Sequence, residues 1–182
     1  MVIETARLSL REMRQSDYPA LARILRDPDV MYAYEGAFSE SETQKWLDKQ
    51  IKNYEDHGFG LWAVFLRATD EMIGQCGLTW QNYKDIQVLE VGYLFQKAFW
   101  HKGYATEAAI ACRDYAFREL NAAEVFSIIR DNNIASQNVA KRNGMIIADT
   151  FIRHHRGIDM PHYLFFVKRG WHNGHHHSQG IT

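Results

Sequence analysis

The spacing at which apolar residues recur changes along this 182-residue chain, from strand-like to helix-like and back. The order of these changes constrains the fold more than any single motif does. A strand-like run at 3–13 precedes two helical runs, at 14–27 and 40–56. Apolar residues then alternate as three successive strands would, and helical and strand-like runs follow in turn. We therefore predict the element order β-α-α-β-β-β-α-β-α-β-β.

Local signals mark where these elements start and stop. A Ser-x-x-Glu-like cap opens the second helix and Gly58 closes it, while Pro28 ends the first helix. A tight turn at 68–71 separates the first two strands of the meander, and the polar residues 81–85 precede the third. The remaining elements are expected at 87–96, 103–120, 124–131, 134–143, 145–154 and 160–169.

An antiparallel block therefore comes before a strand-helix-strand crossover. This order predicts an α/β (α+β) fold with a mixed, mostly antiparallel central sheet and helices on both faces. The crossover makes 93–96 and 126–129 parallel neighbours. Because ligands bind beyond the carboxyl ends of such strands, we expect a site there.

Composition excludes several classes of function. The 21 basic and 22 acidic residues nearly cancel, so no overall field favours nucleic acid or an anionic membrane. No apolar run is long enough to cross a bilayer, and the first residues carry charge where a signal peptide needs an apolar stretch. We expect a soluble cytoplasmic protein with one domain at 1–170.

Histidines and cysteines raise the question of a metal. Nine histidines concentrate near the C-terminus, but the tail at 171–182 is expected to be flexible, with nothing to fix a coordination geometry. Cys76 and Cys112 lie in apolar contexts, without metal-ligand spacing, as reduced core residues do. We expect no native metal, and a histidine-based metal module is a weaker alternative.

The stretch "WHKGYATEA" at 100–108 has the chemistry of an anion cradle. A helix N-terminus presents unpaired N–H groups and a partial positive charge, and Gly103 lets the backbone approach a phosphate closely. Ala105 is small, Thr106 offers a hydroxyl and an amide, and Lys102 adds a point charge. The alternative is a glycine that only eases the turn from strand to helix.

The longer segment "GYLFQKAFWHKGYATEA" at 92–108 resembles the acetyl-coenzyme A binding segment of the GNAT N-acetyltransferases. Trp100, Gly103 and Ala105 occupy the fixed positions of its Arg/Gln-x-x-Gly-x-Gly/Ala pattern, with Trp in place of Arg/Gln. That tryptophan resembles the RimJ/RimL-like branch, and His101 stands where this branch usually has Gly.

Two further segments resemble the same branch. "NIASQNVAKRNGM" at 133–145 is similar to its Asn-x-x-Ser-x-x-Val-x-x-Lys/Arg-x-Gly-Met/Phe pattern, and "IETARLSLREM" at 3–13 is similar to its opening. The resemblance implies the branch's fold and a direct acetyl transfer from acetyl-CoA, the donor co-substrate, to a primary amine. That acceptor would be a protein N-terminus or a small molecule.

The resemblance also implies where the coenzyme lies. Backbone groups at Leu94 and Phe95 would pair with the pantetheine arm and stabilise the oxyanion. The pyrophosphate would lie on the backbone amides of His101, Lys102, Gly103, Tyr104, Ala105 and Thr106. Asn133 would hold the coenzyme or cap the helix that follows it.

Catalysis of this kind needs a base for the acceptor ammonium and a proton for the leaving thiolate. Glu90 is the predicted base, because it is the only acid on its strand and lies just before the thioester site. Many family members use a tyrosine as the acid, but Ala140 occupies that place, so Ser136 is the predicted donor. The alternatives are a salt-bridged Glu90 and a Ser136 that caps its helix.

The predicted acceptor side holds aromatic residues and one carboxylate: Tyr32, Tyr34, Glu35 and Trp80. The rings would contact a cationic amine, or else belong to the core. A second hypothesis for the whole chain is a non-catalytic acyl-CoA-binding sensor, because the usual tyrosine is missing. A homodimer through the C-terminal hairpin is compatible with its aromatic strands.

Overall fold

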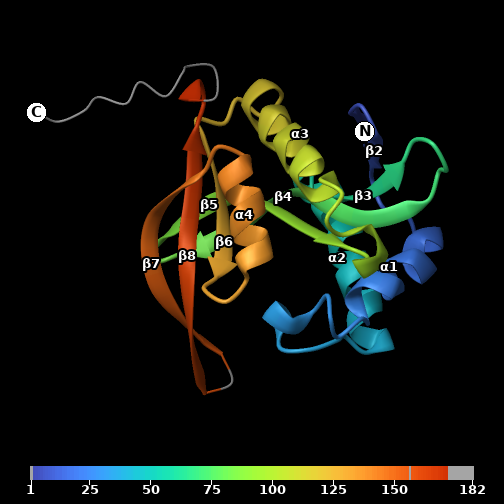
Figure 1. Cartoon of the computed structure of the whole chain (residues 1–182), viewed down its shortest axis with the longest axis horizontal. Coiled ribbons are helices and arrows are strands. Elements are labelled where there is room, and N and C mark those ends of the chain that lie inside the picture. Colours follow the sequence, from blue (N-terminus) through green and yellow to red (C-terminus); the bar gives the residue numbers. More distant parts are fainter. Residues whose placement is uncertain (1, 156, 172–182) are drawn as a thin grey trace, which may run out of the picture.

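The computed structural model describes residues 2–155 and 157–171, which form one mixed sheet with helices on both faces (Figure 1). The strand order is β1-β2-β3-β4-β5-β6-β8-β7. The strands are β1 Val2–Glu4, β2 Leu8–Arg11, β3 Leu61–Leu66, β4 Met72–Tyr83, β5 Ile86–Phe95, β6 Glu124–Arg130, β7 Ile146–His155 and β8 Ile158–Lys168. The helices are α1 Tyr18–Leu25, α2 Glu40–His57, α3 Tyr104–Arg118 and α4 Ile134–Arg142.

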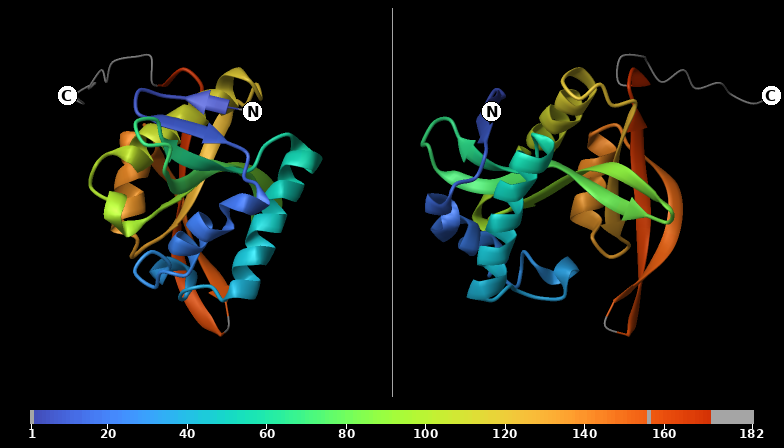
Figure 2. Two further views of the ribbon diagram at one scale, coloured as in Figure 1. Left: turned by 90° about the vertical axis from the view of Figure 1, so that its right-hand side faces the viewer. Right: turned by 180° about the vertical axis from the view of Figure 1, so that it is seen from behind.

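Helices α3 and α4 lie together on one face of the sheet, and α1 and α2 lie on the other (Figures 1 and 2). All neighbouring strand pairs are antiparallel except β5 and β6, which are joined by the α3 crossover. The predicted fold class is therefore confirmed. The predicted tail at 171–182 lies outside the described residues except for Trp171.

Two predicted boundaries are wrong. The run at 3–13 is not one strand but the hairpin β1–β2, whose turn is closed by a 2.9 Å hydrogen bond from the Thr5 N–H to the Leu8 carbonyl. The polar residues 81–85 are mostly strand, because the β4–β5 ladder continues without a break to the pair Tyr83–Ile86. A strand with one face in solvent alternates polar and apolar side chains, so the polar residues in this segment do not indicate a loop.

The ends of α2 agree with the predicted caps. Ser39 Oγ accepts a 3.1 Å hydrogen bond from the Glu42 N–H, and the Ser39 N–H donates to Glu42 Oε2 at 2.7 Å. Gly58 ends the helix with a left-handed φ of 77°. This reciprocal capping box satisfies two backbone groups that the first turn cannot pair internally, so α2 begins where its sequence predicts.

The parallel pair β5–β6 determines where the site lies. Its register contains one matched pair, Glu90 with Phe126. The predicted parallel neighbours β5 and β6 are therefore confirmed, but they pair before residues 93–96 are reached. Side chains replace the next ladder bonds: Ser127 Oγ donates to the Val91 carbonyl at 2.7 Å, and the Ile128 N–H donates to Glu90 Oε2 at 2.9 Å. The two strands diverge beyond this point.

Candidate active site

A cleft of about 470 Å³ opens where β5 and β6 diverge. Its walls come from the loop before α2, from α2 itself, from the β4–β5 hairpin and from β6, β7 and β8. The cleft brings together the residues predicted for catalysis, most of those predicted for the acceptor and some of those predicted for the coenzyme. They are Glu90 and Ser136, then Tyr34, Glu35 and Trp80, and then Leu94 and Asn133.

Glu90 lies on the cleft wall, at the position where β5 pairs with β6. Enclosure there withdraws the carboxylate from water and raises its pKa from 4.5 to about 7, against the opposing effects of the Ile128 N–H and the positive charge of Arg153. No ion pair joins Glu90 to a cation within the described residues. This environment differs from that of a salt-bridged strand carboxylate and suits a group that exchanges a proton near neutral pH.

Asn133 and Ser136 begin α4 at the cleft. Asn133 Oδ1 accepts a 3.1 Å hydrogen bond from the Ser136 N–H, so Asn133 is the helix cap and Ser136 is not. The hydrogen bonds of Ser136 to other described residues use its backbone and leave its hydroxyl available. Tyr32 lies beside the cleft wall, where its hydroxyl donates to Asn133 Oδ1 at 2.9 Å.

Tyr93 is a residue of this site that sequence reasoning missed. Its hydroxyl donates to the Ser136 carbonyl at 2.7 Å and so ties β5 to the start of α4, across the gap left by the diverging strands. Burial raises the pKa of Tyr93 well above its usual value, so it remains a hydrogen-bond donor. The signal was available in "GYLFQ", because a tyrosine beside a predicted thioester site carries a polar group that needs a partner.

The backbone of β5 shows which residues face the gap. The Gln96 N–H donates to the Ile73 carbonyl at 2.9 Å, and the register is unbroken, so Leu94 and Gly92 turn their backbone groups toward β4. Tyr93 and Phe95 turn theirs toward the open side. Of the two residues predicted for the pantetheine arm, Phe95 has the required direction, and the geometry favours Tyr93 over Leu94.

The predicted anion cradle lies at the start of α3, beyond the open end of β5. Gly103 is the cap residue of α3 with a φ of 79°, and His101 also has a left-handed φ of 62°. Trp100 Nε1 donates to the Phe95 carbonyl at 3.0 Å, which joins this loop to the open strand. His101, Lys102 and Gly103 are exposed, and the residues at 104–106 are half-buried.

This cradle fits a phosphate group. Only glycine adopts φ near 79° without strain, and an added Cβ at Gly103 would stand 3.4 Å from the guanidinium of Arg7. The first N–H groups of α3 have no partner within the helix, and they point out of its N-terminus. An open strand edge thus runs toward a helix N-terminus, which suits an extended co-substrate that ends in phosphates.

The predicted acceptor side of the cleft contains more aromatic residues than the sequence analysis named. Tyr34 and Trp80 expose 46% and 45% of their surfaces, and Tyr34 packs edge-on against Trp46 with the ring centres 6.4 Å apart. Phe59 lies 6.3 Å from Trp80 by the same measure. Glu35 lines the cleft with a left-handed φ of 65°. Sequence reasoning missed Trp46 and Phe59 because both belong to runs that also supply the core.

A mixed sheet with one diverging parallel pair, a cleft at the divergence and a helix N-terminus beyond it defines an α/β domain with a ligand cleft at the strand ends. Residues 7–146 match the family model described as Acetyltransferase (GNAT) domain. The chain belongs to the GNAT acetyltransferase family, as its motifs predicted, and is an N-acetyltransferase.

Curated relatives support this assignment. YkkB, an uncharacterised protein of Bacillus subtilis (strain 168), is 37% identical over 147 residues, which cover 80% of this chain and 86% of YkkB. YnaD, an uncharacterised N-acetyltransferase of the same organism, is 32% identical over 146 residues, covering 80% and 82% of the two chains.

Solved structures share the fold. A GNAT-family acetyltransferase from Bacillus anthracis superposes with a TM-score of 0.80 at 25% identity, covering 92% of this chain and 98% of the other. RimL, a ribosomal L7/L12 α-N-protein acetyltransferase in complex with coenzyme A, has the same fold, with a TM-score of 0.75 at 19% identity and coverage of 92% and 98%. This likeness shows that the two proteins share a fold.

Residues 2–155 and 157–171 contain no cluster of three or more histidine, cysteine, aspartate or glutamate side chains placed to hold a metal ion. None of their helices combines the length and apolar character that a membrane span requires.

Proposed function

We propose that this enzyme transfers the acetyl group of acetyl-CoA to a primary amine, with Glu90 as the base. The observation that carries the proposal is a carboxylate with a raised pKa, which faces a cleft beside an open strand edge. Acetyl-CoA supplies a thioester, whose acetyl group passes to the amine while the coenzyme leaves as a thiolate. The acceptor is a protein N-terminus or a small amine.

Each group of residues then has one task. Glu90 accepts the proton that the acceptor ammonium must lose before its nitrogen can attack. The backbone N–H groups of Tyr93 and Phe95 face the gap, where they can bind the pantetheine arm and the oxyanion. Ser136 supplies a hydroxyl for the leaving sulfur, and Tyr93 positions Ser136 through its carbonyl. The amides at 101–106 bind the pyrophosphate.

The test is release of free thiol from acetyl-CoA over a panel of primary amines. Glu90→Gln keeps the size and the acceptor oxygen of the side chain but removes the base, so we expect kcat to fall by about 100-fold or more. Glu55→Gln, on the exposed side of α2, is the matched control and leaves kcat unchanged. Equal activity of wild type and Glu90→Gln would exclude Glu90 as the base.

The alternative is a sensor that binds acyl-CoA without turnover. Calorimetry with acetyl-CoA separates the two functions when it is run beside the thiol assay. Tight binding with no thiol release for any amine would favour the sensor. Because the family match supports acetyl transfer, we expect binding and turnover together.

The predicted homodimer and cytoplasmic location remain proposals. The C-terminal hairpin exposes Ile146, Ile147, Ile152 and Ile158, each by about half of its surface. Sedimentation velocity of the wild type and of Ile152→Glu would test a dimer through this hairpin, because a buried charge there would shift the equilibrium to monomer.

A further inference from the structure

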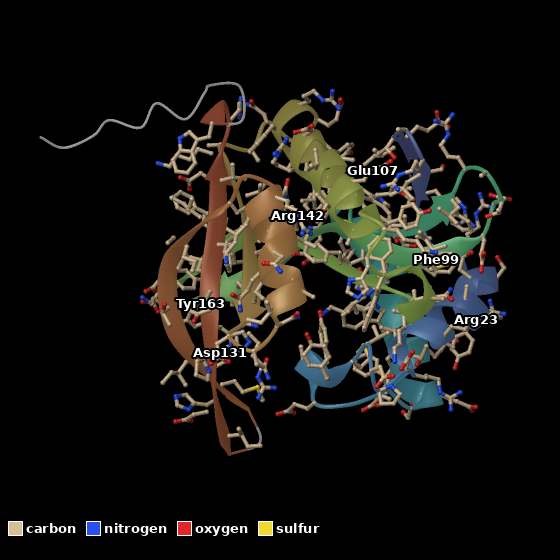
Figure 3. The ribbon with its side chains drawn as sticks, viewed as in Figure 1. Arg23, Phe99, Glu107, Asp131, Arg142 and Tyr163 are labelled. Carbon is tan, nitrogen blue, oxygen red and sulfur yellow. The ribbon has the colours of Figure 1, made fainter. Side chains whose placement is uncertain are left out.

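One face of the β6-β8-β7 half of the sheet carries cationic residues at the cleft. Arg130 lies opposite His162 in the β6–β8 ladder, and Arg153 lies opposite Met160 in the β7–β8 ladder. Directly opposed residues of an antiparallel pair point to the same side, so these four share one face. All four line the cleft. Figure 3 labels Asp131, the next residue after Arg130, at this end of the sheet.

Neither arginine is neutralised by the described part of the chain. Arg130 and Arg153 form no ion pair there, although Arg7, Arg11 and Arg113 each have a carboxylate partner. Arg130 Nε is buried without any hydrogen-bond partner, and Arg153 makes only a 3.5 Å contact with the Asn82 carbonyl. Buried donors are nearly always satisfied in folded proteins, so Arg130 Nε is a donor that the described residues leave unsatisfied at the cleft.

Packing holds Arg153 in place without neutralising it. Its guanidinium lies over the ring of Phe151, 5.7 Å from the ring centre, and Phe151 stacks on His162 at 5.9 Å. Arg153 is close enough for its charge to lower the pKa of Glu90, yet no ion pair joins the two. The cleft therefore contains the carboxylate of Glu90, the proposed base, together with two arginines, Arg130 and Arg153, that form no ion pair with the described residues.

The balance of charge in the cleft disfavours highly cationic acceptors. Its acidic residues are Glu35 and Glu90, and its basic residues are Lys49, Arg130 and Arg153, with His57 and His162 in addition. A polyamine or an aminoglycoside would bring further positive charge against the arginines, at a cost in binding. An arginine fork matches carboxylate and phosphate oxygens in pairs.

We propose that the acceptor is a primary amine that also carries an anionic group, a carboxylate or a phosphate, and that Arg130 and Arg153 bind this group. The inference rests on the proposed function, in which the amine lies beside Glu90. It adds a specificity site that neither the motifs nor the family match assigns, and it selects among the acceptors left open above.

Matched amine pairs test this proposal, each pair differing only in the anionic group. γ-Aminobutyrate is compared with its amide, O-phosphoethanolamine with ethanolamine, and spermidine is the polycation. The protein variants are Arg130→Gln and Arg153→Gln, with Arg153→Lys keeping the charge without the fork. Arg23→Gln is the control, because Arg23 is exposed on α1, on the opposite side of the molecule in Figure 3.

For the wild type, we expect kcat/KM for the anionic member of at least one pair to exceed that of its neutral partner by about tenfold or more. Each glutamine variant removes most of that preference, measured as the ratio of the two kcat/KM values within a pair, while Arg153→Lys restores part of it. Arg23→Gln changes neither value. Equal use of the two members, a preference for spermidine, or an equal loss for both members in the variants would overturn the proposal.

Calorimetry with the same amines separates failure of this inference from failure of the proposed function. If no amine supports thiol release, acetyl transfer fails for this panel. Binding of an anionic amine that is lost in Arg130→Gln and Arg153→Gln would then still support the specificity site. Absence of arginine-dependent binding would overturn it, whatever the turnover.

Discussion

At the scale of single residues, Glu90 combines the features that a base for an ammonium substrate needs. Its carboxylate faces the cleft, one oxygen accepts a hydrogen bond from the Ile128 N–H, and enclosure raises its pKa to about 7. A carboxylate with an ordinary pKa would be ionised at neutral pH but would be a weak base. The raised pKa makes Glu90 a stronger base while leaving it substantially ionised at neutral pH.

The pH profile of turnover tests this role. Glu90 acts in its ionised form, so we expect kcat to rise with pH through an apparent pKa of about 7 and then to level off. In Glu90→Gln the residual activity lacks this rise. A wild-type profile that is flat between about pH 5 and pH 8 would contradict the assignment.

The free energy of unfolding should depend on pH in the opposite direction to kcat. The pKa of Glu90 is about 7 in the folded state and near 4.5 in the unfolded chain, so the folded state holds this proton more tightly. The stabilisation is complete below about pH 4.5 and is lost as pH rises through 7. Relative to Glu90→Gln, the wild type should lose about 2 kcal/mol of unfolding free energy between pH 5 and pH 8. Urea unfolding at several pH values measures this difference, and a constant difference would contradict it.

At the scale of elements, the loop into α3 contains two left-handed residues within three positions. Gly103 has a φ of 79°, which suits glycine, but His101 has a φ of 62°, which is strained for a side chain with a Cβ. The related branch usually has glycine at this place. The histidine therefore replaces a residue that the backbone conformation favours, in a loop that we propose binds phosphate.

Relief of this strain is measurable. His101→Gly should raise the unfolding free energy by about 1 kcal/mol, because glycine adopts the left-handed conformation without a steric penalty. His101→Ala is the control, since it removes the imidazole but keeps the Cβ, and it should give no such gain. If both variants stabilise the protein equally, the imidazole and not the backbone is the source of the strain. Denaturant unfolding and calorimetry with acetyl-CoA would report stability and binding separately.

At the scale of the whole molecule, the N-terminal hairpin is tied to the helix that forms the cradle. Glu107 Oε2 lies 2.7 Å from Arg7 Nε, and Oε1 accepts hydrogen bonds from the Arg7 N–H and the Thr5 hydroxyl. Arg7 also donates to the Lys102 carbonyl at 2.9 Å. Figure 3 labels Glu107 on the first turns of α3. The start of the chain thus supports a loop about 100 residues away.

Loss of this tie should affect both stability and the cradle. Glu107→Gln should lower the unfolding free energy by about 1 kcal/mol, because it weakens three hydrogen bonds to a carboxylate that is only 19% exposed. It should also weaken acetyl-CoA binding by loosening the Lys102 backbone. Glu119→Gln, just beyond the end of α3, is the control. A double-mutant cycle with Arg7→Gln that gives no coupling energy would contradict the tie.

Local sequence patterns predicted nearly all elements of this fold. The predicted boundaries lie close to those observed wherever the signal comes from a few neighbouring residues. Such signals are the spacing of apolar residues, the capping box at Ser39 and the helix-ending Gly58. The predictions were wrong where the structure depends on residues distant in the sequence. The hairpin turn after Glu4 and the continuation of β4 to Tyr83 depend on pairing with another strand, which a single run of residues does not reveal.

The sequence by itself determined the fold class, the family and the segments that form the cradle and the start of α4, because motifs keep these groups within one stretch of chain. Only the tertiary structure decided which backbone groups of β5 face the gap, and that Asn133, not Ser136, caps α4. It alone placed Arg130 and Arg153 on one face beside Glu90. The physical reason is that strand divergence and a shared cleft arise from the pairing of β5 with β6 and of β8 with both β6 and β7, which joins segments far apart in the chain.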